Sequence, residues 1–274
     1  MRLGSIISAG GLALGLVLGL VLAQATAAVA APAGDYTVTA HRGGWIVGSS
    51  ITENSYRALG RAARHGATAI ETDVRMTRDR AFLIMHDASL RRTTDGIGWV
   101  DSRNKRYINR RVRLDNGQRV PYLAGLLRRA RSFGLNVVIE LKADRRDRWT
   151  VEDLQRMVQV IAAHDMTDRV TFLSFDDSLL RLAEEADSSL PTVWIATTPP
   201  ASEDVAARGV DGVAVRWDQI TPELAGQFTD AGIGLRGRDA DDPAAWEAFK
   251  EVGITNVVTD LTPARVEWLG QPVA

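Results

Sequence analysis

The sequence contains no cysteine among its 274 residues. This absence excludes disulfide bonds, a thiolate nucleophile and a lipid-modified cysteine at the end of a leader segment. A chain of this length with 45% hydrophobic residues can bury a full core, so it does not depend on covalent cross-links for stability.

Excess charge of either sign is also missing. The chain has 33 Lys and Arg residues against 34 Asp and Glu residues, which gives a formal net charge of −1. Nothing in this global field favours a polyanionic partner such as nucleic acid. The composition implies no stable protein partner either, and any phosphate recognition has to be local.

The first part of the chain has almost no charged residues. Arg2 is followed by an uncharged run rich in Gly, Leu, Val and Ala that ends in small residues before Pro32. A basic start, an apolar centre and an A-x-A-like exit are typical of a secretory signal peptide. We therefore predict a signal peptide over residues 1–31, cleaved close to Ala30 or Ala31, and a secreted or extracytoplasmic protein. The alternative is an uncleaved membrane anchor, because the apolar run approaches the length of a spanning helix.

From residue 35 onward, apolar strand-like segments alternate with amphipathic helix-like segments. The expected strands are residues 37–40, 69–75, 136–142, 170–175, 192–196, 212–216, 234–236 and 256–259. The expected helices are residues 55–65, 122–133, 151–164, 178–186, 203–208, 222–231 and 243–252. Eight such alternations predict an α/β fold, a closed (β/α)8 TIM barrel that forms a single domain over residues 35–270. A doubly wound open sheet is the competing architecture.

The segment from Asp87 to Val120 breaks the alternation. It is rich in Arg, Asp, Asn and Gly and shows no hydrophobic period, which predicts a loop insertion over the mouth of the barrel. Residues 82–85, just before it, form a candidate extra strand.

Polar residues directly follow several of the expected strands. His41, Asp73, Lys142 and Asp260 stand at predicted carboxyl ends, where the active sites of barrel enzymes are built. This placement favours the closed barrel over the open sheet and predicts a single site at its mouth.

Carboxylates recur at alternate positions of two expected strands. The side-chain period of a strand is two, so Glu71 and Asp73 project to one face together, and so do Glu140 and Lys142. The bland alternatives are a salt-bridged strand end for the first pair and an internal ion pair for the second.

A single histidine is more often a surface or core residue than a catalyst. That interpretation suits His65 and His164, which close expected helices, where an imidazolium complements the helix dipole. His41 differs, because it follows an apolar strand and precedes Arg-Gly-Gly, a stretch whose backbone can approach a ligand closely.

Taken in order and spacing, five segments of the chain resemble the glycerophosphodiester phosphodiesterase family. These segments are HRGG at 41–44, ENS at 53–55, ETD at 71–73, HD at 86–87 with the following LRRTTDG, and IELK at 139–142. The resemblance weakens in the second half of the chain, to a closing VVTD at 257–260.

The resemblance implies a role for each matching residue. One divalent metal, Ca²⁺ or Mg²⁺, would be held by Glu71, Asp73 and Glu140. General acid and base catalysis would fall to His41 and His86. Arg42 and Lys142 would contact the phosphate. Glu53 and Asn54 would support the residues that bind the metal and the substrate.

Elementary chemistry agrees with these implied roles. Carboxylate oxygens without His or Cys select Ca²⁺ or Mg²⁺ over zinc. Two imidazoles with pKa values near neutrality can exchange protons with the nucleophile and the leaving alkoxide. By resemblance, the nucleophile would be the neighbouring hydroxyl of the substrate's own glycerol, which gives a cyclic phosphate that water then opens.

One late strand departs from the family pattern. Members often show a Trp-Thr-like stretch where this chain reads Gly-Leu-Arg-Gly-Arg-Asp at 234–239. Arg236 and Arg238 are expected to pair with Asp239, Asp241 and Asp242 rather than to bind anionic head groups.

The sequence leaves three hypotheses for the function. The leading one is an exported, metal-dependent phosphodiesterase that hydrolyses small-molecule glycerophosphodiesters to sn-glycerol 3-phosphate and an alcohol. The second is a sphingomyelinase-D-like phospholipase that acts on intact lipids. The third is a non-catalytic phosphate- or carbohydrate-binding barrel, which would not need both histidines.

Overall fold

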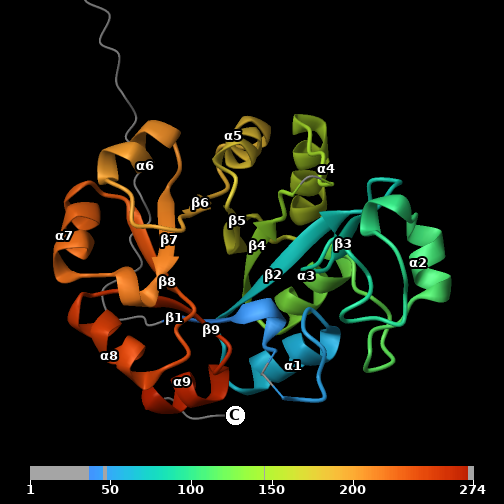
Figure 1. The fold of residues 1–274 in the computed structure, drawn as a ribbon, viewed down its shortest axis with the longest axis horizontal. Coiled ribbons are helices and arrows are strands. Elements are labelled where there is room, and N and C mark those ends of the chain that lie inside the picture. Colours follow the sequence, from blue (N-terminus) through green and yellow to red (C-terminus); the bar gives the residue numbers. More distant parts are fainter. Residues whose placement is uncertain (1–36, 46–47, 145, 271–274) are drawn as a thin grey trace, which may run out of the picture.

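Eight parallel strands close into a barrel in the computed structural model, which describes residues 37–45, 48–144 and 146–270 (Figure 1). The strands are β1 (Thr37–Ala40), β2 (Ala69–Met76), β4 (Asn136–Leu141), β5 (Val170–Ser174), β6 (Thr192–Ile195), β7 (Gly212–Arg216), β8 (Gly234–Arg238) and β9 (Asn256–Thr259). Their order around the barrel follows the sequence, and β1 closes it by pairing with both β9 and β2. The predicted TIM barrel is confirmed and the open sheet is not. The predicted signal peptide lies outside the described residues.

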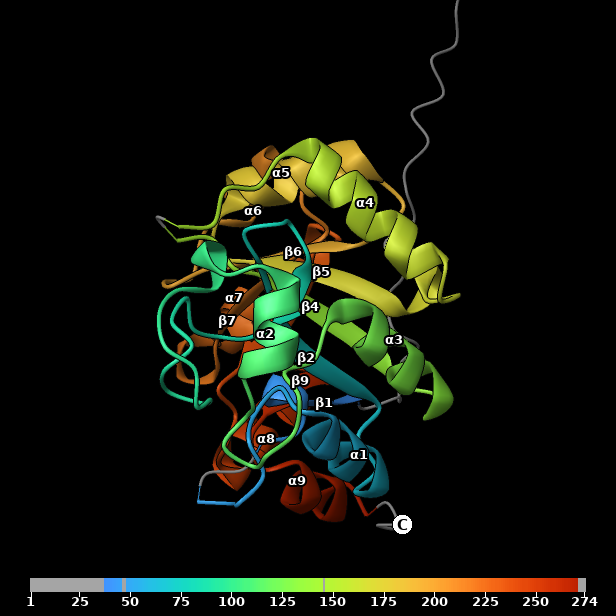
Figure 2. The same cartoon turned by 90° about the vertical axis from the view of Figure 1, so that its right-hand side faces the viewer.

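Helices cover the outside of the barrel, as the two views in Figures 1 and 2 show. They are α1 (Tyr56–Arg64), α3 (Leu123–Ser132), α4 (Val151–Ala162), α5 (Asp177–Ala186), α6 (Ser202–Arg208), α7 (Pro222–Asp230), α8 (Pro243–Glu251) and α9 (Thr262–Trp268). Single 3-10 turns are η1 (His41–Gly43), η2 (Val100–Ser102), η3 (Thr167–Arg169) and η4 (Trp217–Gln219). Of the helices in the described ranges, none combines the length and the apolar character needed to cross a bilayer.

Side-chain caps fix where several helices begin. Ser55 accepts a hydrogen bond from the backbone of Ala58 at the start of α1, and Thr150 forms a capping box with Asp153 at the start of α4. These bonds satisfy backbone N–H groups that the first helical turn leaves free. The caps therefore fix where α1 begins after β1 and where α4 begins after β4.

The barrel strands bury side chains on both faces. Outward residues such as Ile70, Ile139 and Phe172 pack against the helices, whereas Val138 and Leu173 belong to a small apolar cluster inside the barrel. Because the strand period is two, the inward set continues along the same strands toward the carboxyl ends. There the apolar residues give way to carboxylates and cations.

The insertion between β2 and α3 has a folded structure of its own. It begins with β3 (Phe82–Ile84), which pairs antiparallel with the second half of β2, as the extra-strand prediction expected. It also contains α2 (Lys105–Arg111), which the prediction of a loop insertion did not include. Eight buried apolar side chains form a separate core under it: Leu83, Met85, Leu90, Val100, Ile108, Val112, Leu114 and Val120. They are spread through a polar segment without a regular period, which is why the pattern was missed.

Candidate active site

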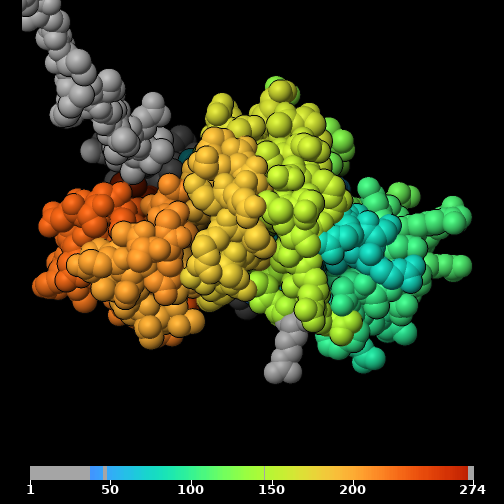
Figure 3. Space-filling model, turned by 90° about the horizontal axis from the view of Figure 1, so that it is seen from above, coloured from blue at the N-terminus to red at the C-terminus, as the bar shows by residue number. Residues whose placement is uncertain are grey.

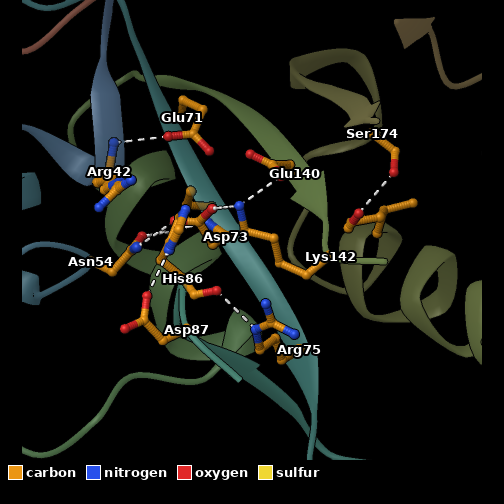
Figure 4. A network of polar contacts seen from close by, with 12 residues as sticks. Arg42, Asn54, Glu71, Asp73, Arg75, His86, Asp87, Glu140, Lys142 and Ser174 are labelled. Carbon is orange, nitrogen blue, oxygen red and sulfur yellow. Dashed lines mark hydrogen bonds and ion pairs between the residues drawn. The ribbon is translucent and has the colours of Figure 1, made fainter. Parts of the chain in front are cut away.

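Three carboxylates from neighbouring strands converge inside the mouth of the barrel (Figure 4). Glu71 and Asp73 lie on β2 and Glu140 lies on β4, where the register pairs Asp73 with Glu140. All three are buried, and their nearest oxygens lie within 4.8 Å of one another. No other group of three potential metal ligands with this spacing occurs in the part of the chain that the structure describes.

The carboxylates of this cluster repel one another, and this repulsion contributes to raised pKa values for two of them. Burial and the charge of Asp73 raise the pKa of Glu71 to about 8, and the same two causes raise the pKa of Glu140. Burial opposes ionisation of Asp73, but Lys142 and other donors lower its pKa to about 2. One oxygen of Glu71, Oε1, is buried without a hydrogen-bond partner among the described residues. An all-oxygen donor set with excess negative charge and a free ligand atom fits a hard divalent cation.

The turn after β1 adopts a conformation that non-glycine residues rarely take. Arg42 has φ +47° and ψ +41°, and Gly43 and Gly44 follow with positive φ. Arg42 N donates to Glu71 Oε2 at 2.8 Å, and its carbonyl accepts from Asn54 N at 2.7 Å. These bonds hold a strained backbone in place, which is common where a site needs a fixed geometry. A Cβ on Gly44 would lie 2.6 Å from the Cβ of Ala62, so glycine lets the turn rest on α1.

Glu53 and Asn54 contact Arg42 and Asp73, two of the residues that the family resemblance implies they support. Asn54 Nδ2 donates to Asp73 Oδ2 at 2.7 Å, and its Oδ1 accepts from Thr72 Oγ1 at 2.8 Å. Buried Glu53 accepts from Arg42 Nη1 at 3.0 Å. One residue thus orients a carboxylate of the cluster and the other orients the guanidinium beside it.

His41 is oriented by a carboxylate from the far end of the chain. Its Nδ1 donates to Asp260 Oδ1 at 2.7 Å, while its Nε2 lies 3.9 Å from Glu71 Oε2. Burial lowers the pKa of His41, but the hydrogen bond to Asp260 and the charge of Glu71 outweigh burial and raise it to about 9. Asp241 fixes Asp260 in turn by accepting from its backbone N at 2.7 Å. Two carboxylates therefore favour the imidazolium form of His41.

His86 is held in a similar way but lies in a different electrostatic environment. Its Nδ1 donates to Asp87 Oδ1 at 2.8 Å, and its carbonyl accepts from Arg75 Nε at 2.8 Å. Burial lowers the pKa of His86, Asp73 raises it, and the positive charge of Lys142 lowers it, with a net decrease. The two histidines are thus held alike through Nδ1 and differ in which protonation state their surroundings favour.

Arg92 joins both sides of the site, and its role was missed at the sequence level. Its Nη1 and Nη2 donate to the two oxygens of Glu53 at 2.8 and 2.6 Å, and its Nε donates to Asp87 Oδ2 at 2.7 Å. Arg92 therefore connects the support of Arg42 to the carboxylate that holds His86. Its signal was present in the LRRTTDG stretch after His86, but one arginine among many in a polar insertion carries no pattern of its own.

Replacing Arg92 by Met is expected to lower kcat by up to about a hundredfold, the typical cost of displacing a catalytic group by about 1 Å. KM should change little, because Arg92 orients other residues rather than the substrate. Arg92→Lys should be impaired as well, since an ammonium cannot form the forked contacts. The measurement is a steady-state comparison with Arg91→Met, the exposed neighbour, as the control. An equal loss in the control would show that Arg92 has no special role.

Lys142 and the two arginines of β8 also occupy defined places. Lys142 Nζ lies between Asp73 Oδ1 at 2.8 Å and Glu140 Oε1 at 2.6 Å, so it belongs to the carboxylate cluster. Arg238 pairs with Asp239, as expected. Arg236 forms no hydrogen bond or ion pair with the described residues, so its expected pairing was wrong. Burial lowers its pKa to about 10, and the nearby charge that opposes this effect is Asp211, which precedes β7.

Known proteins resemble this chain over most of its length. The model of the glycerophosphoryl diester phosphodiesterase family matches residues 41–263, which include every residue of the site described above. The chain belongs to this family. A protein of Mycobacterium tuberculosis named as a probable glycerophosphodiester phosphodiesterase 2 is 29% identical over 262 residues, covering 84% of this chain and 92% of the relative. The glycerophosphodiester phosphodiesterase of Bacillus subtilis is 26% identical over 247 residues, covering 81% and 82%.

Solved structures of family members share the barrel. A phosphodiesterase of Oleispira antarctica, in complex with the product sn-glycerol-3-phosphate, superposes with a TM-score of 0.76 at 21% identity and covers 86% of this chain and 97% of its own. A glycerophosphodiester phosphodiesterase of Agrobacterium tumefaciens gives a TM-score of 0.71 at 21% identity, with coverage of 83% and 97%. As a member of the glycerophosphoryl diester phosphodiesterase family, the chain is an enzyme of phosphodiester hydrolysis, and its carboxylate cluster is a candidate metal site.

Proposed function

We propose that this enzyme is exported and uses one divalent cation to hydrolyse glycerophosphodiesters to sn-glycerol 3-phosphate and an alcohol. The observation that carries the proposal is the buried carboxylate cluster flanked by two histidines, each with its Nδ1 fixed by an aspartate. The uncharged run before Pro32 supports export, as a signal peptide would. The product bound to the Oleispira antarctica relative supports glycerol 3-phosphate as the product here.

The cation would be held by Glu71, Asp73 and Glu140, and it would be Ca²⁺ or Mg²⁺ because all three donors are carboxylates. When bound, it offsets the negative charge that develops on the phosphoryl oxygens. Arg42 is positioned to add a guanidinium contact to the same phosphate, since Glu53 fixes its side chain beside the cluster. Lys142, directly after β4, would supply a second positive charge.

The histidines divide the proton transfers between them. His41 is the general acid, because its hydrogen bond to Asp260 favours its protonated form, and its Nε2 lies on the side of the cluster, 3.9 Å from Glu71 Oε2. His86 is the general base, because burial and Lys142 favour its neutral form. A bound cation would offset the charge of Glu71 but would leave the hydrogen bond that His41 Nδ1 donates to Asp260 in place. The difference between the two imidazoles therefore does not rest on Glu71 alone.

The reaction needs no side-chain nucleophile under this assignment. His86 takes the proton from the hydroxyl that neighbours the phosphoester on the glycerol, and that oxygen attacks phosphorus. His41 gives its proton to the departing alcohol oxygen, which leaves a cyclic glycerol phosphate. Water then opens the ring with the two imidazoles in exchanged roles, so both histidines return to their starting states.

The direct test is release of glycerol 3-phosphate from glycerophosphocholine. Residues 32–274 are the form to use, because every described element lies between Thr37 and Trp268. We expect no release by protein stripped with a chelator and restored release on adding Ca²⁺ or Mg²⁺. Release that is unaffected by chelation would contradict the metal assignment. No release with either cation, together with cleavage of a lysophospholipid, would favour the phospholipase alternative.

A further inference from the structure

The insertion carries a charge that the rest of the chain does not. Residues 87–120 contain nine Lys and Arg residues against four Asp residues, whereas the remainder of the chain has 24 basic and 30 acidic residues. A near-neutral protein therefore concentrates positive charge in one folded segment. Figure 2 shows α2 and the loops around it together on the side of the molecule that faces the viewer, and Figure 3 shows the same segment standing out at one end.

Most of these basic side chains have no structural task. Five are exposed and form no side-chain hydrogen bond, ion pair or ring contact with the described residues: Arg91, Arg106, Arg110, Arg111 and Arg119. Lys105 is exposed too, but its Nζ lies over the ring of Tyr122 at 5.0 Å. Arg106 and Arg110 are one helical turn apart and lie opposite buried Ile108 on α2, so both point outward. By contrast, Arg42 and Arg75 outside the insertion, and Arg92 within it, are held by carboxylates. The unpaired set therefore forms a surface rather than part of an ion-pair network.

Apolar side chains are exposed on the same segment. Ile97 is 60% exposed and Trp99 is 47% exposed, which places them among the most exposed large hydrophobic residues of the described chain. The guanidinium of Arg103 joins them to α2, since it donates to Ile97 O at 3.4 Å and lies over the ring of Tyr107 at 4.8 Å. Arg146 lies over the ring of Trp99 at 4.7 Å. Aromatic and aliphatic tips interleaved with arginines suit the interface between water and lipid.

We propose that the insertion is a docking surface for an anionic lipid bilayer, with Arg106 and Arg110 attracting the head groups and Ile97 and Trp99 entering the interface. Charge complementarity selects the lipid: unpaired cations on an otherwise acidic protein attract anionic head groups and hold neutral ones poorly. The two apolar tips favour a bilayer over a soluble polyanion, because a polyanion in water offers them no apolar environment.

The insertion that carries the docking surface also supplies residues to the active site. The insertion has its own buried core, so its surface residues keep a fixed arrangement. It also supplies Asp87 and Arg92, which hold His86 and Glu53. A bilayer bound at α2 would therefore keep the enzyme next to the membrane, where phospholipids are converted to glycerophosphodiesters.

Vesicle co-sedimentation tests this docking surface without using the catalytic chemistry. Residues 32–274 are mixed at low salt with vesicles of phosphatidylcholine alone or with added phosphatidylglycerol. We expect binding only to the anionic vesicles, weakened at high salt. Since each basic residue near an anionic surface contributes about fivefold in affinity, the double variant of Arg106→Gln and Arg110→Gln should bind about 25-fold more weakly.

A matched pair of substitutions controls for overall charge. Arg64 and Arg128 are exposed arginines outside the insertion, on α1 and α3, and replacing both by Gln should change binding by about twofold at most. Equal losses in the two double variants, or no binding of the wild-type chain, would overturn the proposal. All variants should hydrolyse soluble glycerophosphocholine as the wild-type chain does, which separates this surface from the proposed catalytic function.

The apolar tips distinguish a bilayer from a soluble polyanion. Ile97→Ser with Trp99→Ser should remove most of the binding that survives high salt, while binding to polyphosphate stays unchanged. If this variant binds anionic vesicles as well as the wild-type chain does, and polyphosphate displaces both equally, the surface recognises polyanions and the lipid assignment is wrong.

Discussion

Replacing Glu71 by Gln is expected to lower hydrolysis of glycerophosphocholine by roughly a thousandfold or more. A bound metal typically contributes several kcal/mol to the transition state, and each 1.36 kcal/mol is a factor of ten in rate. Gln keeps the shape of the side chain and can still accept from Arg42 N, so the change isolates the carboxylate charge. The loss should be visible both in steady-state rates and in calorimetric titration with Ca²⁺ and Mg²⁺.

The same substitution should stabilise the fold of the metal-free protein. Glu71 has a pKa raised to about 8 by burial and by Asp73, so near neutral pH the folded state holds a proton that the unfolded state has released. A raised carboxylate pKa costs stability wherever the unfolded state is ionised, and removing the group removes that cost. The Tm of metal-free Glu71→Gln should therefore exceed that of the metal-free wild type. Only the wild type should gain stability when the cation is added.

A surface control makes this prediction strict. Glu152 is exposed in the first turn of α4 and forms no ion pair with the described residues, so its replacement by Gln should leave both the rate and cation binding unchanged. If Glu71→Gln keeps wild-type cation affinity, the carboxylate cluster is not the metal site. If it loses affinity but keeps activity, the metal is not catalytic.

The two histidine variants should lose activity to a similar extent but respond differently to the leaving group. With glycerophosphocholine, His41→Ala and His86→Ala should each lose about a hundredfold to ten-thousandfold in rate, the usual contribution of a general acid or base. With the 4-nitrophenyl ester of glycerol phosphate, the leaving group departs without protonation. His41→Ala should then recover to within about tenfold of the wild type, while His86→Ala stays impaired, because attack still needs a base.

His164 provides the matched control for this comparison. Its Nδ1 contacts Val160 O at 2.8 Å, just after the end of α4, and it has no contact with the carboxylate cluster among the described residues. His164→Ala should hydrolyse both esters at the wild-type rate. Recovery of His86→Ala instead of His41→Ala would exchange the assigned roles, and recovery of neither would mean that general-acid catalysis by these residues is not limiting.

The barrel could be predicted from the sequence because its signals are local and repeated. Most strands contain a short β-branched or apolar run, with β8 (Gly234–Arg238) as the exception, and capping residues such as Ser55, Thr150 and Thr221 mark the helix starts. The carboxylates could be placed together for the same reason: a period of two fixes which residues share a face, and parallel strands put their carboxyl ends at one rim. The carboxylate cluster on β2 and β4 follows from these two rules.

The rest of the site depends on contacts that no local pattern encodes. Asp260 was noticed only as a polar strand end, since its hydrogen bond to His41 depends on barrel closure rather than on spacing. Arg92 acts through a loop whose path is set by the small core under the insertion. Arg236 faces the interior because neighbouring Gly237 faces α8, where an added Cβ would lie 1.9 Å from the Phe249 ring. Such side-chain directions come from packing.

Closure of the barrel by its first and last strands also has a consequence for when the enzyme becomes active. His41 follows β1 and Asp260 follows β9, and the bond between them spans 219 residues. A ribosome has to release the chain through β9 and Asp260 before β9 can pair with β1 and complete this dyad. Until then, a growing or truncated chain holds all three carboxylates of the cluster but lacks an oriented His41. The order of synthesis itself is therefore expected to delay phosphodiester cleavage until β9 and Asp260 have been made.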